Sequence, residues 1–464
     1  MQRLGTVVTN KTQFLLNKYF TGHTMTYKQM FAMIIPIFVD MAFIVIMSIM
    51  NTAMISSSGV AAVSAVSSVD TLNIFIMSVF IAIATGGTVI VAQYKGSGNQ
   101  EMVSRTAAQS ISTVTLISLL ISLFVIIFNT STLQLLFGSA EAEVLHNAKI
   151  FLIGNCISFP FLGLYQAITG VLRGVADTKA CLVLSIILNA TYFFLNIILI
   201  TIFDFGVIGL TVSLIIARVI GAVASFIYLL KYDHTLRFKV KDALKLNYSI
   251  IRKMMYIGLP FAAEQMFFNG GKILTQTFIV QFGTLAMTIN AISNSIAMLF
   301  QMVGNALAVA IVTIVGQCIG RNDIPDARKF IRSLHGLSAV SFLLMAAIII
   351  PFFPMIVNLF SPPAEIVPTI YILMVMLAIA HPLVWSISFM MPSALRAAGD
   401  SKFTSITSLL TMWLFRIILG YILGVTLGYG IIGIWIAMVA EWAVRGVIFT
   451  WRYKGDKWYK HKLI

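Results

Sequence analysis

The stretch FVDMAFIVIMSIMNTAMI, residues 38–55, is an apolar segment with one carboxylate near its start. Its length and composition predict a membrane-spanning helix, because about 20 apolar residues cross the hydrocarbon core of a bilayer. The carboxylate belongs to Asp40, and an acid at the centre of a membrane helix costs about 3 kcal/mol on insertion scales. We therefore expect Asp40 to face a cavity or a partner rather than lipid.

The whole chain repeats this character. Of its 464 residues, 59% are apolar and 10% are charged, and the mean hydropathy is +0.96. A soluble protein has about 25% charged residues, so the composition predicts an all-α polytopic membrane protein. We expect twelve transmembrane helices, at residues 29–54, 64–93, 108–130, 146–171, 180–203, 207–230, 251–281, 287–318, 330–358, 366–395, 403–426 and 430–451.

The net charge of +15 comes from 31 Lys and Arg against 16 Asp and Glu. With the twelve expected spans, most of the basic residues fall in loops and tails on one side of the membrane. The positive-inside rule places that side, and both termini, in the cytoplasm. The basic excess therefore predicts topology and contact with the bilayer, in the cell membrane, and not nucleic-acid binding. The three cysteines lack metal-ligand spacing, and we expect no metal site.

A polar segment at the centre of the chain, KYDHTLRFKVKDALKLNYSIIRKM (231–254), divides it into two halves. We expect a cytoplasmic tail at 1–28, a six-helix lobe at 29–230, an interlobe linker at 231–250, a second six-helix lobe at 251–452 and a tail at 453–464. The alternation of basic and apolar residues in the linker suits a short helix on the membrane surface.

The two halves repeat one pattern. A shift of 224 in residue number places Pro36 on Pro260 and Asp40 on Glu264, and VLRGVADTK (171–179) matches ALRAAGDSK (394–402) at a shift of 223. Because each half has six spans, both insert with the same orientation, which predicts two pseudo-symmetric bundles around a central cleft. The second lobe thus supplies Asp40 with a symmetry mate, Glu264, as its expected companion across the cleft.

These motifs resemble the multidrug and toxic compound extrusion (MATE) transporters of the multidrug/oligosaccharidyl-lipid/polysaccharide flippase superfamily. The resemblance rests on the proline-led first span, on VAQYKGSGN (91–99) with its counterpart VGQCIGRND (315–323), and on the two LR…D(T/S)K loops. It implies a proton- or sodium-driven exporter with twelve helices around a central cavity.

The acids that many relatives use are absent here. The position of the first-span acid is Asn51, the fifth-span acid is replaced by Ile200, and the tenth span, 371–395, has no acid. Asp40 shares a helix face with Asn51, since eleven residues turn an α-helix to within about 20° of the same azimuth. We therefore name Glu264 and Asp40 as candidate cation-coupling residues. The alternative is a buried acid that stays neutral, or pairs with Lys272 or Arg416, without a transport role.

Polar residues inside the spans are the candidates for the substrate cavity: Asn51, Asn196, Gln265, Asn269, Lys272 and His381. Lys272 has three open roles, namely to pair with Glu264, to line the cavity or to bind an anionic group. The carboxamides could equally join helices through hydrogen bonds, and His381 could equally be a packing residue. Glu441 and Arg445, four residues apart, predict an ion pair, and Arg218 is expected to pair within its own lobe.

The leading functional hypothesis is an antiporter that exports amphiphilic drugs or metabolites, cations among them, in exchange for H⁺ or Na⁺. It needs no cofactor, and we expect a monomer. The alternative is a flippase for a lipid or lipid-linked glycan, which a cleft lined by basic residues would favour. A channel or a membrane enzyme fits less well, because the sequence lacks a filter repeat, an HExxH motif and a phosphate loop.

Overall fold

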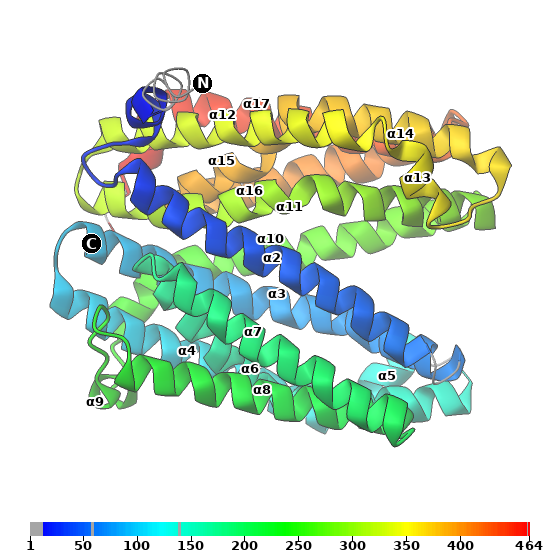
Figure 1. Cartoon of the computed structure of the whole chain (residues 1–464), viewed down its shortest axis with the longest axis horizontal. Helices are drawn as coiled ribbons and strands as arrows, with labels where there is room; N and C mark the ends of the chain where they lie inside the picture. The colour runs from blue at the N-terminus through cyan, green and yellow to red at the C-terminus, as the bar shows by residue number, and fades with distance from the viewer. Residues whose placement is uncertain (1–12, 57–59, 138–140, 462) are drawn as a thin grey trace, which may run out of the picture. The chain divides into compact units, whose positions relative to one another are not determined.

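The computed structural model describes residues 13–56, 60–137, 141–461 and 463–464, and within them the chain is helical without a strand (Figure 1). Of the expected tail 1–28, residues 1–12 lie outside this description. The helices up to the centre of the chain are α2 Tyr27–Ser56, α3 Val60–Gly96, α4 Gln100–Ile127, α5 Asn129–Phe137, α6 Ala142–Gly174, α7 Thr178–Asn196, the π-helical η1 Ile197–Ile202, α8 Gly206–Lys231 and α9 Val240–Leu244.

The second half of the chain has the same alternation of long helices and short turns. Its helices are α10 Tyr248–Val280, α11 Thr284–Gly320, α12 Ile324–Ile349, α13 Phe353–Asn358, η2 Ala364–Ile366, α14 Val367–Ala380, η3 His381–Trp385, α15 Ser386–Ala397, α16 Ser401–Thr411, η4 Met412–Leu419, η5 Ile422–Thr426, α17 Gly430–Lys454 and η6 Lys457–Tyr459.

Eleven helical segments of the described residues, some of which join consecutive helices, are long and apolar enough to span a membrane. The helix of the expected seventh span, α10, is not among them although it has 33 residues. Its hydropathy is lowered by the polar residues Glu264, Gln265, Asn269 and Lys272. The exception is thus the helix that carries four of the candidate site residues.

The chain forms two compact units. The N-terminal unit holds residues 35–262, and the C-terminal unit holds residues 1–34 together with 263–464. The units therefore divide inside α2 and α10 and not in the polar segment 231–250. In the N-terminal unit α6 packs against α3, α4 and α8, and α7 lies beside α8 (Figure 1). In the C-terminal unit α11 packs against α12 and α15.

The internal repeat is visible in the backbone of the turns. Four residues with left-handed φ recur at a shift of 223 or 224, as the pairs Gly98 and Asn322, Ala176 and Gly399, Asp204 and Gly428, and Gly206 and Gly430. The N-caps of α4 and α12, Asn99 and Asp323, are also related by this shift, and each side chain accepts a backbone N–H three residues on. Because left-handed φ is costly for most residues, these shared turns support duplication independently of sequence identity.

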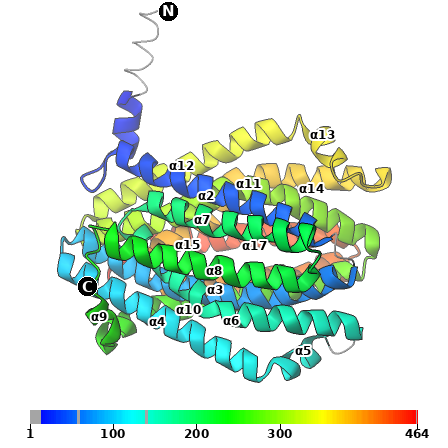
Figure 2. The ribbon, with the colours of Figure 1, turned by 60° about the horizontal axis from the view of Figure 1, so that its bottom comes forward.

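The segment expected to be a linker folds onto the N-terminal unit. It contains the short helix α9, which lies against α4 (Figure 2). The Gln109 side chain of α4 donates to the carbonyls of Asp242 and Lys245, both at 2.7 Å, and Ser112 donates to Ala243 at 2.6 Å. The placement of this segment on the cytoplasmic membrane surface stays a prediction.

Candidate functional site

Asp40 lies on α2 and is buried, with 4% of its surface exposed. The guanidinium of Arg173, at the end of α6, lies 3.8 Å from its Oδ2 atom, while its Oδ1 atom has no hydrogen-bond partner among the described residues. The local charge balance is thus supplied by an arginine of the same unit.

Glu264 on α10 is held more tightly. Its Oε2 atom accepts from Arg396 at 3.1 Å and from the hydroxyl of Ser405 at 2.9 Å. Arg396 lies in the last turn of α15 and Ser405 belongs to α16, so three helices of the C-terminal unit meet at this carboxylate. Removing one partner of this buried ion pair would destabilise the protein, because a lone buried charge is costly.

The two acid–arginine pairs are equivalent positions of the repeat. Asp40 and Glu264 are related by the shift of 224, and Arg173 and Arg396 by the shift of 223. The expectation that Glu264 is the companion of Asp40 across the cleft stays a prediction, whereas within its own unit each acid pairs with the arginine of its own LR…D motif. The physical reason is that a guanidinium within the same helix bundle neutralises the carboxylate directly.

A cavity of about 390 Å³ lies in the N-terminal unit. Asn51 forms part of its wall and accepts a hydrogen bond of 2.9 Å from the buried Asn196. Asp70 and Arg218 bring opposite charges to the wall. The polar lining residues are Asn51, Asp70, Asn73, Asn155, Asn189, Tyr192 and Arg218.

Arg218 pairs within its own lobe, as predicted. Its guanidinium donates to the hydroxyl of Ser158 at 2.6 Å and to the side-chain oxygen of Asn155 at 3.1 Å. Asn73 donates to Asp70 at 3.2 Å. The cavity therefore contains one carboxylate and one guanidinium, each fixed by neutral neighbours.

A second cavity, of about 370 Å³, lies in the C-terminal unit. Its polar lining residues are Lys272, Thr275, Gln276, Asn290, Asn294, Gln301, Arg416 and Trp435. Asn290 donates to Gln276 at 2.9 Å and accepts from Trp435 at 3.1 Å. The charged groups of this wall are two cations.

The two cavities are the same site in the two halves of the repeat. Most positions of the first wall recur in the second at a shift of 224, among them the pairs Asn51 and Thr275, Ile55 and Ile279, Asp70 and Asn294, Tyr192 and Arg416, Leu210 and Ile434, and Leu214 and Met438. The polarity differs because the acid Asp70 is replaced by Asn294 and the phenol Tyr192 by the cation Arg416. The repeat thus retained the cavity and changed its charge.

Asp70 is an acidic residue of the cavity wall that was not among the candidates predicted from the sequence. It lies in α3, and the sequence signal was an acid inside the expected span 64–93. The tertiary fold places it on the wall of an internal cavity.

Lys272 lines the cavity of the C-terminal unit, which is one of the three roles left open for it. Its ammonium lies 4.8 Å from the centroid of the Phe268 ring, a cation–π contact. No ion pair joins Lys272 to Glu264 within the described part of the chain. Lys272 is therefore a cation whose side chain faces the cavity.

Arg416 forms an ion pair behind the cavity wall. Glu441 of α17 accepts from Arg416 at 2.7 Å and also pairs with Arg445 at 2.8 Å. The predicted pair of Glu441 and Arg445 is thus confirmed and extended by a second arginine. Two buried guanidinium groups share one carboxylate, so this cluster keeps a net positive charge.

His381 lies in the π-helical segment η3 and is fully buried. Its Nδ1 atom is 2.8 Å from the carbonyl of Leu377, and its ring packs against Phe300, Phe342, Trp385 and Trp442. These contacts favour the packing role over a place in the substrate cavity. Gln265 and Asn269 lie half-buried on α10, outside the residues that line the two cavities.

Comparison with known proteins gives the family. The MatE model matches residues 36–202 and 260–422, so that each half of the chain matches once and the two matches start at Pro36 and Pro260. The chain belongs to the MatE family of transporters. The uncharacterized transporter YisQ of Bacillus subtilis is 30% identical over 438 residues, which cover 92% of this chain and 94% of YisQ.

Other relatives carry more specific names. The probable multidrug resistance protein YoeA of Bacillus subtilis is 25% identical and the match covers 85% of this chain and 88% of YoeA. The probable multidrug resistance protein NorM of Thermotoga maritima is also 25% identical, with 83% of each chain covered. Among solved structures, an outward-facing multidrug resistance MATE transporter superposes with a TM-score of 0.84 at 18% identity, covering 92% of this chain and 95% of that one. This likeness confirms the fold of the MATE transporters.

Proposed function

We propose that this protein is a secondary-active exporter of amphiphilic compounds, driven by exchange for H⁺ or Na⁺. The observation that carries the proposal is the pair of equivalent cavities in a MatE fold, each lined by a few fixed polar groups and by apolar and aromatic side chains. Such walls suit drug-sized ligands. The names of the relatives YoeA and NorM, both probable multidrug resistance proteins, support the same class of substrate.

The coupling groups in this proposal are Glu264 and Asp40, each paired with an arginine. Protonation of Glu264 would remove its charge, break its attraction to Arg396 and leave a lone guanidinium between three helices. Sodium binding would compete with the arginine for the same carboxylate. Either event changes the relative free energy of two conformations by the few kcal/mol that alternating access requires.

A second function is favoured by the cavity of the C-terminal unit. Lys272 and Arg416 face it without a carboxylate among its lining residues in the described chain. A flippase or exporter for an amphiphile with an acidic headgroup would use this charge, because arginine and lysine bind phosphate and carboxylate groups. A purely cationic substrate would instead be directed to Asp70 in the N-terminal unit.

The test uses purified protein in liposomes with an imposed proton or sodium gradient. Efflux of a cationic dye and of an anionic amphiphilic dye is followed for the wild type and for Glu264→Gln, Asp40→Asn and Lys272→Gln. We expect Glu264→Gln to lower gradient-driven efflux roughly 5- to 150-fold, the range of a coupling free energy of about 1–3 kcal/mol. Asp40→Asn should have a smaller or comparable effect.

The control separates coupling from folding. Glu264→Gln alone leaves Arg396 without its carboxylate, whereas Glu264→Gln with Arg396→Gln removes both charges and restores the balance. If the double variant folds and keeps the full ion dependence of the wild type, Glu264 is not a coupling residue. If the wild type exports only the anionic dye and Lys272→Gln loses that efflux, the result favours the second function.

The remaining features of the proposal concern the cellular setting. The protein would act in the cell membrane as a monomer, with both termini in the cytoplasm. It would need no cofactor beyond the coupling ion.

A further inference from the structure

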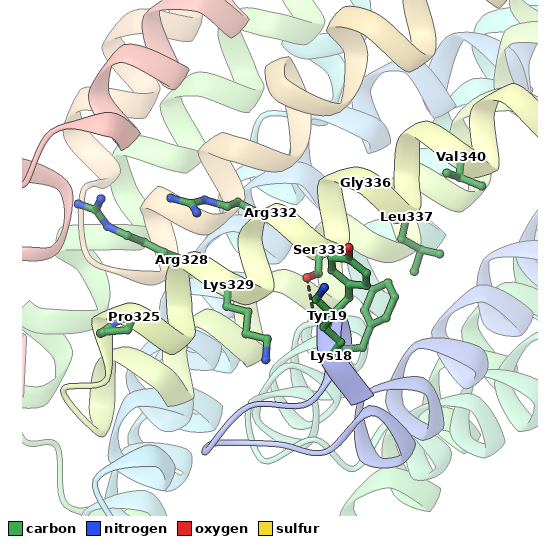
Figure 3. A pocket seen from close by; sticks show the side chains of 11 residues that line it. Lys18, Tyr19, Pro325, Arg328, Lys329, Arg332, Ser333, Gly336, Leu337 and Val340 are labelled. Carbon is green, nitrogen blue, oxygen red and sulfur yellow. Dashed lines mark hydrogen bonds between the residues drawn. The ribbon is translucent and has the colours of Figure 1, made fainter. Parts of the chain in front are cut away.

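A groove of about 940 Å³ lies between the N-terminal segment and α12, both in the C-terminal unit. Its lining residues are Lys18, Tyr19, Phe20, Pro325, Arg328, Lys329, Arg332, Ser333, Gly336, Leu337 and Val340. Figure 3 shows the basic side chains toward one end of α12 and the apolar Leu337 and Val340 toward the other. The groove therefore has a charged end and an apolar end.

The N-terminal segment is fixed to α12 by hydrogen bonds. Ser333 donates to the carbonyl of Tyr19 at 2.5 Å (Figure 3). Lys329 donates to the carbonyl of Thr21, also at 2.5 Å. The backbone N–H of Thr24 donates to Asp326 at 2.8 Å. These bonds hold the helical residues 13–20 beside α12, so the groove is a formed site.

The charged end has an excess of cations. Arg328 is paired with Asp456 at 2.9 Å, and Lys329 donates one hydrogen bond to the carbonyl of Thr21. Lys18 and Arg332 are exposed and have no acidic partner among the described residues. The groove lining itself contains no acid in the described chain. This end therefore presents three basic groups that can bind an anion.

The apolar end is open over Gly336. A Cβ atom at Gly336 would meet nothing within 4 Å. Phe20, Leu337 and Val340 surround this space with apolar surface. An apolar chain can therefore lie along α12 over Gly336, one to two turns into the helix from the basic residues.

We propose that this groove binds an anionic phospholipid. Its phosphate contacts Lys18, Lys329 and Arg332, and one acyl chain lies over Gly336 against Leu337 and Val340. The groove begins at the end of a candidate membrane span, where lipid headgroups lie, and continues along that span toward the hydrocarbon. Basic groups beside a headgroup and apolar groups beside its chain match the order of polarity in a lipid. The proposal stands apart from the efflux function, because no residue of the two internal cavities takes part in it.

Native mass spectrometry of the full-length protein in a neutral detergent tests this inference. Dioleoylphosphatidylglycerol and dioleoylphosphatidylcholine are titrated in turn. We expect the first phosphatidylglycerol to bind about tenfold more tightly than phosphatidylcholine, because both carry a phosphate but only phosphatidylcholine carries a choline cation, which the basic groups of the groove repel. Arg332→Gln should remove this preference, and Gly336→Phe should weaken both lipids by filling the space for the chain without changing charge.

Lys231→Gln is the matched control, since Lys231 is an exposed basic residue at the end of α8 outside the groove. An equal loss in Lys231→Gln and Arg332→Gln would mean general charge attraction and overturn the proposal. Wild-type binding in Gly336→Phe would overturn the placement of the acyl chain. Displacement of the lipid by inorganic phosphate alone, at equal concentration, would show a free anion site and not a lipid site.

Discussion

Asp400 shows how one residue joins distant parts of the C-terminal unit. It follows the left-handed Gly399 in the second LR…D loop and is buried. Its carboxylate accepts from Arg452 at 2.7 and 3.2 Å, and His461 Nε2 lies 3.2 Å away. In the first half the equivalent Asp177 accepts from Tyr228 at 2.7 Å, and the shift of 224 places Tyr228 on Arg452. The loop is thus tied to the last helix of each half.

These contacts predict a pH dependence of stability. Burial by itself raises the pKa of Asp400, but the hydrogen bonds and charges of His461 and Arg452 outweigh it and hold the pKa below its ordinary value. The unfolded chain therefore takes up the proton first as the pH falls. The stabilisation is complete above the unfolded pKa of about 3.9 and is lost as the pH falls through the folded pKa.

We expect Asp400→Asn to lower the free energy of unfolding by about 3 kcal/mol at pH 7, because it leaves Arg452 without its partner. Below the folded pKa the variant and the wild type should converge. Thermal unfolding in detergent, from pH 7 down through the folded pKa of Asp400, measures both. Glu365→Gln, at an exposed acid, is the control, and parallel curves for Asp400→Asn and the wild type at every pH would contradict the prediction.

At the scale of elements, the motifs GVIG (206–209) and GIIG (430–433) set how a helix meets the π-helical turn before it. A Cβ atom at Gly433 would lie 2.7 Å from the carbonyl carbon of Leu423, and one at Gly209 would lie 2.9 Å from the carbonyl oxygen of Leu199. The same shift of 224 places Leu199 on Leu423. The last glycine of each motif is therefore required by close approach to a backbone that cannot move aside.

Gly433→Ala and Gly209→Ala should each destabilise the protein by about 1–3 kcal/mol through overpacking. Gly336→Ala is the matched control, because its Cβ would meet open space and alanine favours a helix by up to about 1 kcal/mol over glycine. Thermal unfolding of the three variants gives the comparison. A loss in Gly336→Ala as large as in Gly433→Ala would show that the close approach is not the cause.

At the scale of the whole molecule, the charge distribution predicts the orientation in the membrane. Lys241→Cys, in the segment between the halves, should react with a membrane-impermeant maleimide only from the cytoplasmic side, and Glu365→Cys only from the outside. The native Cys156, Cys181 and Cys318 are buried, so their background reaction should be low. Labelling of both positions from the same side, in a transport-competent protein, would contradict the twelve-span topology.

Much of this protein follows from its sequence alone. Apolar segments of fixed length predict membrane helices because the bilayer sets one thickness for all of them. A constant shift of 224 along the chain predicts two equivalent halves, and it places Asp40 and Glu264 in equivalent positions. These properties are local or periodic, so they can be read without knowing which helices are neighbours.

The tertiary structure decided which groups meet. Arg173 and Arg396 are each several helices away from their acids along the chain, and no local pattern relates the rotation of one helix to that of its neighbour. For the same reason the sequence did not reveal that Asp70 lines a cavity, or that two equivalent cavities differ in charge where Asn294 replaces Asp70 and Arg416 replaces Tyr192. Hydropathy fixes that a helix lies in the membrane, but only packing against other helices fixes which face it turns to a cavity.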